Sequence, residues 1–210
     1  RAAWFQGIRA EVYTLNYLVT ALAVFLALRW DEEPGTRGGH VLLVALVLGL
    51  GLTNHHYLVL LTLPAFAVLL LTRPEGRGWL APRRLLPLLG IVAAGLLVYA
   101  FLPLRASAGI DLAWGDPTRP GGFLRMVSAR AFHLSVTEMP RAPLLEACTT
   151  ILESWIGLLG PVLFFAGLLG LAAWVWRSPR IGGFLALLMA AGLLSKAIMY
   201  LDVENPDDHG

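Results

Sequence analysis

Long apolar runs, separated by charged residues, proline and glycine, make up most of the chain. Six such runs occur, at about residues 12–28, 41–53, 57–72, 85–102, 156–176 and 181–200. None shows the strict alternation of a half-buried strand. A bilayer core of about 30 Å needs about 20 residues of helix, and in lipid only helices or closed barrels satisfy the backbone. The pattern predicts an all-α, polytopic membrane bundle of about six transmembrane helices.

Two of the connections between these runs predict further structure. Only the Asn-His-His sequence at residues 54–56 separates the short second and third runs, which predicts a tight helical hairpin. The connection at residues 103–155 is long, and apolar residues recur at helical spacing in two parts of it, from Pro120 to about residue 134 and again from Pro143. We expect these two helices to be amphipathic and to lie along the membrane surface.

The composition supports a membrane protein and excludes other classes. Hydrophobic residues make up 57% and charged residues 14% of the chain, and the mean hydropathy is +0.69. A soluble domain has roughly 45–50% apolar and about 25% charged residues. The single cysteine, Cys148, excludes an internal disulfide framework and supports no structural zinc. A formal charge of +2 is too balanced for a nucleic-acid surface.

The arginines predict which side of the membrane each connection occupies. Short cytoplasmic loops hold an excess of Lys and Arg. Eight arginines lie in the three short connections at residues 29–40, 72–84 and 176–180, namely Arg29, Arg37, Arg73, Arg77, Arg83, Arg84, Arg177 and Arg180. We expect these connections to be cytoplasmic and the loop at 103–155 to be extracytoplasmic. The strong Arg-over-Lys bias favours a bacterial protein, and therefore the inner (plasma) membrane.

Polar residues in and beside the spans are costly in lipid, so their positions indicate function. In this layout they gather on the extracytoplasmic side. The candidates for supporting catalysis are Glu11, His55 and Asp116. The candidates for binding substrate are His56, Arg105, Trp114, Arg125, Arg130 and Asp202.

A structural alternative stands beside each candidate. Glu11 can simply interact favourably with a helix dipole. His55 and His56 point about 100° apart on a helix, so they cannot both face one ion, and they can form a polar hairpin tip. Asp116 precedes a proline and can fix its own turn.

The cations near the outer interface have two interpretations as well. Arg105 can grip a lipid phosphate bidentately or can be a snorkelling side chain at the end of a span. Arg125 and Arg130 can form a cationic face for a phosphate or can be solvated. Asp202 can pair with Lys196 near the outer interface, which would neutralise both groups. No P-loop, Gly-x-Gly-x-x-Gly, Gly-x-Ser-x-Gly or His-Glu-x-x-His motif occurs, so no soluble cofactor and no metal are predicted.

Four motifs, in this order and spacing, resemble a known family. They are AEVYTLN at residues 10–16, GLTNHH at 51–56, YAFLPLR at 99–105 and WGDP at 114–117, and YLDV at 200–203 resembles a further landmark. Together they resemble the protein O-mannosyltransferase-like polytopic membrane family of the GT-C glycosyltransferase superfamily. The resemblance covers about residues 1–135, so we expect the chain to be a single partial membrane domain.

The resemblance implies a GT-C fold and a transfer reaction. Mannose or another hexose would pass from a polyprenyl-phosphate donor to a hydroxyl of a protein acceptor on the extracytoplasmic side. In that family the acidic catalytic loop precedes the motif that contains Glu11, so the catalytic base is expected outside these 210 residues. Glu11, His55 and Arg105 are the motif positions carried over, and the turn from Trp114 to Asp116 would shape the mouth of the site.

Two other functions remain open from the sequence. A polytopic transporter or lipid flippase also needs many helices, although it would place ionisable residues deep in several spans, and these spans hold few. A non-catalytic subunit of an envelope polysaccharide system would use the same outer motifs to bind protein.

Overall fold

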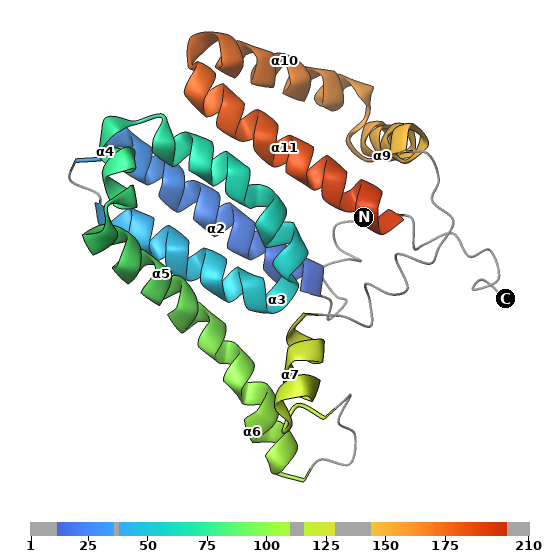
Figure 1. Cartoon of the computed structure of the whole chain (residues 1–210). Helices are drawn as coiled ribbons and strands as arrows, with labels where there is room; N and C mark the ends of the chain where they lie inside the picture. The colour runs from blue at the N-terminus through green and yellow to red at the C-terminus, as the bar shows by residue number, and fades with distance from the viewer. Residues whose placement is uncertain (1–11, 36–37, 110–115, 129–143, 201–210) are drawn as a thin grey trace, which may run out of the picture.

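The computed structural model describes residues 12–35, 38–109, 116–128 and 144–200, and these are helical or in turns. The described part contains no strand, so the predicted all-α class is confirmed (Figure 1). The α-helices are α2 (Val12–Glu32), α3 (Gly38–Leu71), α4 (Pro74–Arg77), α5 (Pro82–Leu96), α6 (Phe101–Ser107), α7 (Pro120–Val127), α9 (Leu144–Leu159), α10 (Pro161–Arg177) and α11 (Pro179–Tyr200). Two 3-10 helices, η1 (Gly78–Leu80) and η2 (Leu97–Ala100), flank α5.

Helix α3 lies at the centre of the fold. Helices α2, α5 and α11 pack against it, and α10 packs on the outer side of α11 with α9 at its end (Figure 1). The core consists of small and branched apolar side chains from α2, α3 and α11, and Phe66 meets the fully buried Phe184 edge to face. The apolar runs have no polar stripe, so amphipathicity does not determine which faces are buried. Shape complementarity between the packed side chains determines it.

The predicted hairpin at residues 54–56 is confirmed. The backbone of α3 leaves helical geometry at His55, where φ is −151° and ψ is 82°. A Cβ on Gly51 would lie 3.0 Å from Cγ2 of Val59. Eight residues span about 12 Å along a straight helix. The chain therefore folds back at His55, and both ends of α3 lie at the same end of the bundle (Figure 1).

The prediction of six separate transmembrane helices is wrong. By length and composition, two described helical segments could cross a membrane, Gly38–Leu71 and Pro82–Ser107. The 34 residues of the first are divided between the two arms of the fold-back at His55. A third is reached only if Cys148–Gly157 and Pro161–Arg177, bent by 113°, form one broken span.

Local features explain the difference. The second and third runs lie in one folded-back helix, α3. The fifth run is divided at Gly160, whose φ of 76° ends α9, and Pro161 opens α10. Charges enter the last turns of α2, and the apolar part of α11, Pro179–Ser195, is short.

The two helices predicted in the long loop have different outcomes. Helix α7 begins at Pro120 as predicted but ends at Val127, with Ser128 as its C-cap, and residues 129–134 of the predicted helix lie outside the described residues. Helix α9 begins at Leu144, directly after Pro143, and its Ile151 side chain is buried while Leu145 and Glu153 are exposed. Their position on a membrane surface stays a prediction.

Large apolar side chains cover the outer surface of the helices. Helix α10 buries none of its described residues, and Val162 and Trp176 are 79% and 92% exposed. Helix α5 buries only Gly95. Monomeric soluble proteins rarely expose contiguous apolar patches of this kind, so these faces suit a lipid environment.

Candidate functional site

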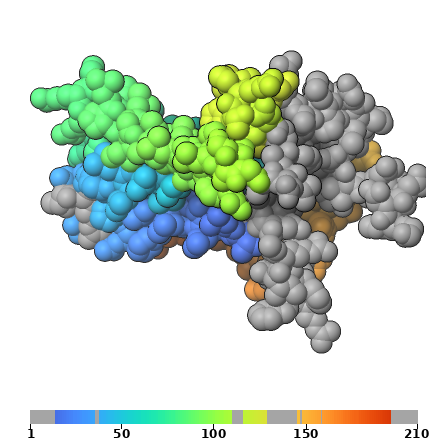
Figure 2. Space-filling view, turned by 90° about the horizontal axis from the view of Figure 1, so that it is seen from below, coloured from blue at the N-terminus to red at the C-terminus, as the bar shows by residue number. Residues whose placement is uncertain are grey.

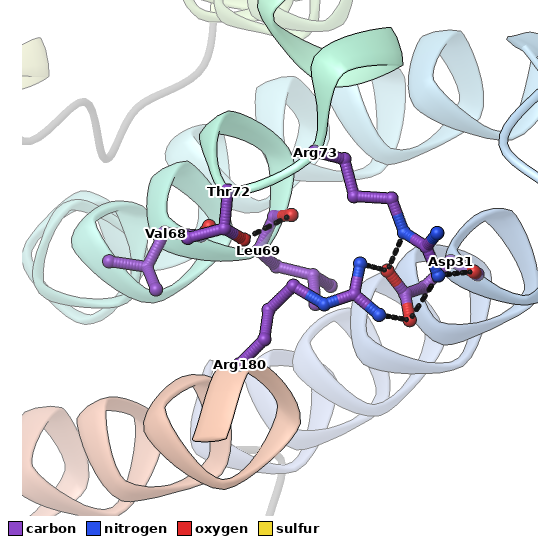
Figure 3. Close-up of polar contacts among 6 residues, drawn as sticks. All are labelled: Asp31, Val68, Leu69, Thr72, Arg73 and Arg180. Atoms are coloured by element: carbon purple, nitrogen blue, oxygen red, sulfur yellow. Dashed lines mark hydrogen bonds and ion pairs between the residues drawn. The ribbon is translucent and has the colours of Figure 1, made fainter. Parts of the chain in front are cut away.

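The two ends of the bundle carry different chemistry. Asp31, at the end of α2, meets Arg73 after α3 and Arg180 at the start of α11 (Figure 3). The three Arg-rich connections thus gather at one end, which we call the Asp31 end. The turn of α3 at His55 lies at the other, the hairpin end.

The carboxylate of Asp31 is held by two arginines. The Nε atom of Arg73 donates to Oδ1 at 3.0 Å, and Nη2 of Arg73 donates to the Asp31 carbonyl at 2.7 Å. The Nη2 atom of Arg180 donates to Oδ2 at 2.6 Å. The Asp31 side chain is 9% exposed. Sequence reasoning counted these arginines only as loop charges and missed Asp31, whose one signal was a carboxylate at the end of an apolar run.

The hairpin end is built on a close crossing of α3 and α5. A Cβ on Gly95 would lie 2.6 Å from the carbonyl carbon of Gly49, so only glycine allows the two backbones to approach this closely. The crossing brings η2 beside the hairpin, where the Tyr99 hydroxyl donates to the Leu52 carbonyl at 3.0 Å. A helix that ends leaves its last carbonyls without intrahelical donors. Tyr99 therefore ties α5 to the turn at His55.

The two histidines lie at this turn, half-buried. The ring of His56 packs on Tyr57 with centroids 4.2 Å apart. His55 occupies the residue at which the helix breaks. The polar hairpin tip and a site for substrate are both compatible with this placement.

Arg105 lies beyond the crossing, on α6. Its side chain is exposed, and the neighbouring Ser107 hydroxyl donates to the Pro103 carbonyl at 2.8 Å. Figures 1 and 2 show α6 and α7 side by side at this end of the molecule, with α5 and α6 lying across α2 and α3 in Figure 2. Arg125 is exposed on α7. Among the described residues, no carboxylate pairs with Arg105 or Arg125.

Asp116 fixes the turn that leads into α7. Its carboxylate accepts hydrogen bonds from the Thr118 hydroxyl and, at 3.2 Å, from the Thr118 backbone N–H, and it pairs with Arg119 at 3.1 Å. The hydrogen bond from the Thr118 hydroxyl, more than the charge of Arg119, lowers the pKa of this exposed carboxyl. A Cβ on Gly122 would overlap the Asp116 carbonyl, so the turn packs tightly on α7. These contacts favour the structural role for Asp116.

The structure does not describe four of the predicted site residues. Glu11, Trp114, Arg130 and Asp202 lie outside the described residues. Within the described ranges, no group of three His, Cys, Asp or Glu side chains is arranged to hold a metal ion.

Sequence reasoning gave no role to Asn16, although this residue belongs to the first of the family motifs. Asn16 is buried on α2, and in the described part of the chain its Oδ1 atom has no hydrogen-bond partner. It lies one turn from Val19, which contacts Gly51 near the hairpin. An amide within an apolar run is the sequence signal that could have identified it.

Comparison with known proteins agrees with the resemblance seen in the motifs. Residues 1–78 match the domain family described as the protein O-mannosyl-transferase TMEM260 N-terminal domain. The chain is 35% identical over 130 residues to the protein O-mannosyl-transferase TMEM260 of Mus musculus, a match that covers 59% of this chain and 18% of that protein. The chain thus spans less than a fifth of this relative. No solved structure matches the chain significantly. Over part of its length, the chain is therefore a distant homologue of protein O-mannosyl-transferase TMEM260 that matches its N-terminal domain.

Proposed function

We propose that this chain is part of a membrane glycosyltransferase of the inner (plasma) membrane. The enzyme would transfer mannose or another hexose from a polyprenyl-phosphate donor to a protein hydroxyl on the extracytoplasmic side. The observation that carries the proposal is the 35% identity over 130 residues to a protein O-mannosyl-transferase. The homology supports the glycosyltransferase class, and the geometry of the hairpin end supports the lipid-linked donor.

The donor would bind beside α5 and α6. An apolar strip of exposed side chains, Leu97, Val98, Phe101 and Leu104, leads along η2 and α6 to Arg105. A polyprenyl chain can lie on such a strip, and a guanidinium without a carboxylate partner can bind a phosphate through two hydrogen bonds. Arg125 on α7 would add a second cation.

The transfer reaction would use these groups in a defined way. The acceptor hydroxyl oxygen attacks the anomeric carbon of the sugar as the bond to the phosphate oxygen breaks. The departing phosphate gains negative charge, which Arg105 would stabilise. A carboxylate must take the hydroxyl proton. We assign that base to the part of the enzyme outside these residues, with Glu11 and His55 in supporting roles.

The experiment uses the purified full-length protein, a labelled polyprenyl-phosphate mannose and candidate acceptor proteins. We expect label transfer by the unaltered protein and loss of most transfer in Arg105→Ala, with unchanged expression. Arg177→Ala is the matched control, because it removes an exposed arginine from the Asp31 end and should leave transfer unchanged. Uptake of the labelled lipid by vesicles without transfer would instead establish a flippase. Neither activity in folded protein would favour a non-catalytic subunit.

A further inference from the structure

A groove between α3 and α5 opens at the Asp31 end, away from the proposed transfer site. Its volume is about 490 Å³. Five apolar side chains line it, Leu42, Leu43 and Leu46 from α3 and Ile91 and Ala94 from α5, with Gly39 and His40 at its start. Both helices begin at the Asp31 end and run in the same direction (Figure 1). The groove therefore starts at the rim of the bundle and continues toward its middle.

An arginine and a tryptophan flank the start of this groove. A Cβ on Gly38 would lie 3.5 Å from Cζ2 of Trp79, so the indole of η1 covers the first turn of α3. The guanidinium carbon of Arg84 lies 5.6 Å from the centroid of the Trp79 ring. Tryptophan prefers the boundary between lipid tails and headgroups. This rim is thus arranged as an interface, with an apolar groove on one side and cations on the other.

The rim carries a net positive charge, and only some of its arginines bind other protein groups. Residues 72–84 carry four arginines and one glutamate, Glu75. Arg73 binds Asp31, and Arg77 donates to the Leu71 carbonyl at 2.9 Å. Arg83 and Arg84 are exposed, and no carboxylate among the described residues pairs with either.

We propose that this groove and its rim form a binding site for an anionic phospholipid. One acyl chain would lie against the apolar walls of α3 and α5, and the phosphate would bind Arg83 and Arg84 beside Trp79. Basic pockets between membrane helices bind anionic headgroups in this way. The partner is a structural lipid of the membrane rather than the sugar donor, and the proposal does not depend on the transferase reaction.

Native mass spectrometry of the purified full-length protein in detergent tests this proposal. The two probes are dioleoylphosphatidylglycerol and dioleoylphosphatidylcholine, which share their acyl chains and differ in headgroup charge. We expect tighter binding of the phosphatidylglycerol. The double substitution Arg83→Gln and Arg84→Gln should weaken phosphatidylglycerol binding about thirtyfold and leave phosphatidylcholine binding unchanged.

Three controls separate the site from general charge effects. Arg177→Gln removes one arginine at the same end from α10, which does not pack on α5, and should change binding by less than about twofold. Ala94→Trp fills the groove without changing charge and should weaken binding of both lipids. Glycerol phosphate, which has the phosphate but no acyl chains, should not compete.

Several outcomes would overturn the proposal. Equal affinity of the unaltered chain for the two lipids would do so, as would a phosphatidylglycerol preference that survives the double substitution. If Arg177→Gln lost as much phosphatidylglycerol affinity as the double substitution, the lipid would be held by diffuse electrostatic attraction rather than by a specific site. Arg83→Gln alone guards against misfolding, because Arg83 is exposed, and it should retain the circular dichroism spectrum while weakening phosphatidylglycerol binding about fivefold.

Discussion

Arg180 donates at 2.6 Å to Asp31, a residue 149 positions earlier in the chain. This contact joins the start of α11 to the end of α2, and Arg73, which follows α3, binds the same carboxylate (Figure 3). One buried acid thus fixes three connections that the sequence separates widely. It also places the arginine-rich connections at a single end of the bundle.

Removing the charge of Asp31 should therefore destabilise the whole bundle. In Asp31→Asn, Arg73 and Arg180 face each other with no carboxylate between them. Removing one partner of a fully buried pair costs about 3–5 kcal/mol, and removing one partner of an exposed pair costs about 0–1 kcal/mol. The side chains of Arg73 and Arg180 are 30% and 22% exposed, so we expect an intermediate cost of about 2–3 kcal/mol. We expect thermal unfolding in detergent to show a loss of this size, with earlier proteolysis between α10 and α11.

The matched control is Glu32→Gln, one residue further along α2. Glu32 pairs with Arg29 at 2.6 Å on the exposed surface, where such a pair contributes about 0–1 kcal/mol. Equal stability losses in the two variants would show that Asp31 has no special role.

Two glycines of α5 should respond in opposite directions to alanine. A Cβ at Gly95 would lie 2.6 Å from the α3 backbone, so Gly95→Ala should cost about 1–3 kcal/mol by forcing the helices apart. Gly90 has no atom within 4 Å of an added Cβ, so Gly90→Ala should stabilise the helix by up to about 1 kcal/mol. Thermal unfolding of both variants checks this, and losses of equal sign and size would contradict the close crossing.

The Tyr99 hydroxyl should contribute measurably to the hairpin. In Tyr99→Phe the Leu52 carbonyl loses its donor, which should cost about 1 kcal/mol of stability. Tyr17→Phe is the control, because Tyr17 is exposed on α2 and should tolerate the change. Hydrogen exchange of the backbone at residues 52–56 should rise in Tyr99→Phe alone. Unchanged exchange there would remove Tyr99 from the support of the turn.

Asp116 should titrate below 3.8, its ordinary value, because Thr118 stabilises the carboxylate. A lowered pKa means that this contact stabilises the turn before α7 at neutral pH and is lost as the pH falls through the folded-state pKa. An NMR titration of the carboxyl carbon measures the pKa directly. Thr118→Val should raise the pKa more than Arg119→Gln does. A larger effect of Arg119→Gln would mean that the guanidinium charge, rather than the Thr118 hydroxyl, is the main cause of the lowered pKa.

The sequence was sufficient to predict the features of the fold that depend on neighbouring residues. Three polar residues between short apolar runs predicted the fold-back at His55, and Pro120 and Pro143 marked the starts of α7 and α9. The number of spans could not be predicted in this way. A run of apolar letters does not show that Gly160 takes a positive φ and divides the fifth run.

The chemistry of the site was predicted less fully than the fold. The motifs pointed to His55 and Arg105, which lie toward the same end of the bundle. Pairing over long sequence separation could not be predicted, so the partners of Asp31 and the contact of Tyr99 with Leu52 come from the structure alone. The position of Asp116 in a loop was also insufficient to predict its role. Its carboxylate makes three contacts, two with Thr118 and one with Arg119, and these make it part of a turn.

We place His55 and Arg105 on one side of the membrane and the Asp31 end on the other. Cysteine accessibility measures this directly. In a Cys148→Ser background, single cysteines at His55, Arg105 and Arg84 are exposed to a membrane-impermeant maleimide in sealed vesicles of known orientation. We expect His55→Cys and Arg105→Cys to be labelled from the same side and Arg84→Cys from the opposite side. Labelling of His55→Cys and Arg105→Cys from opposite sides would contradict this arrangement.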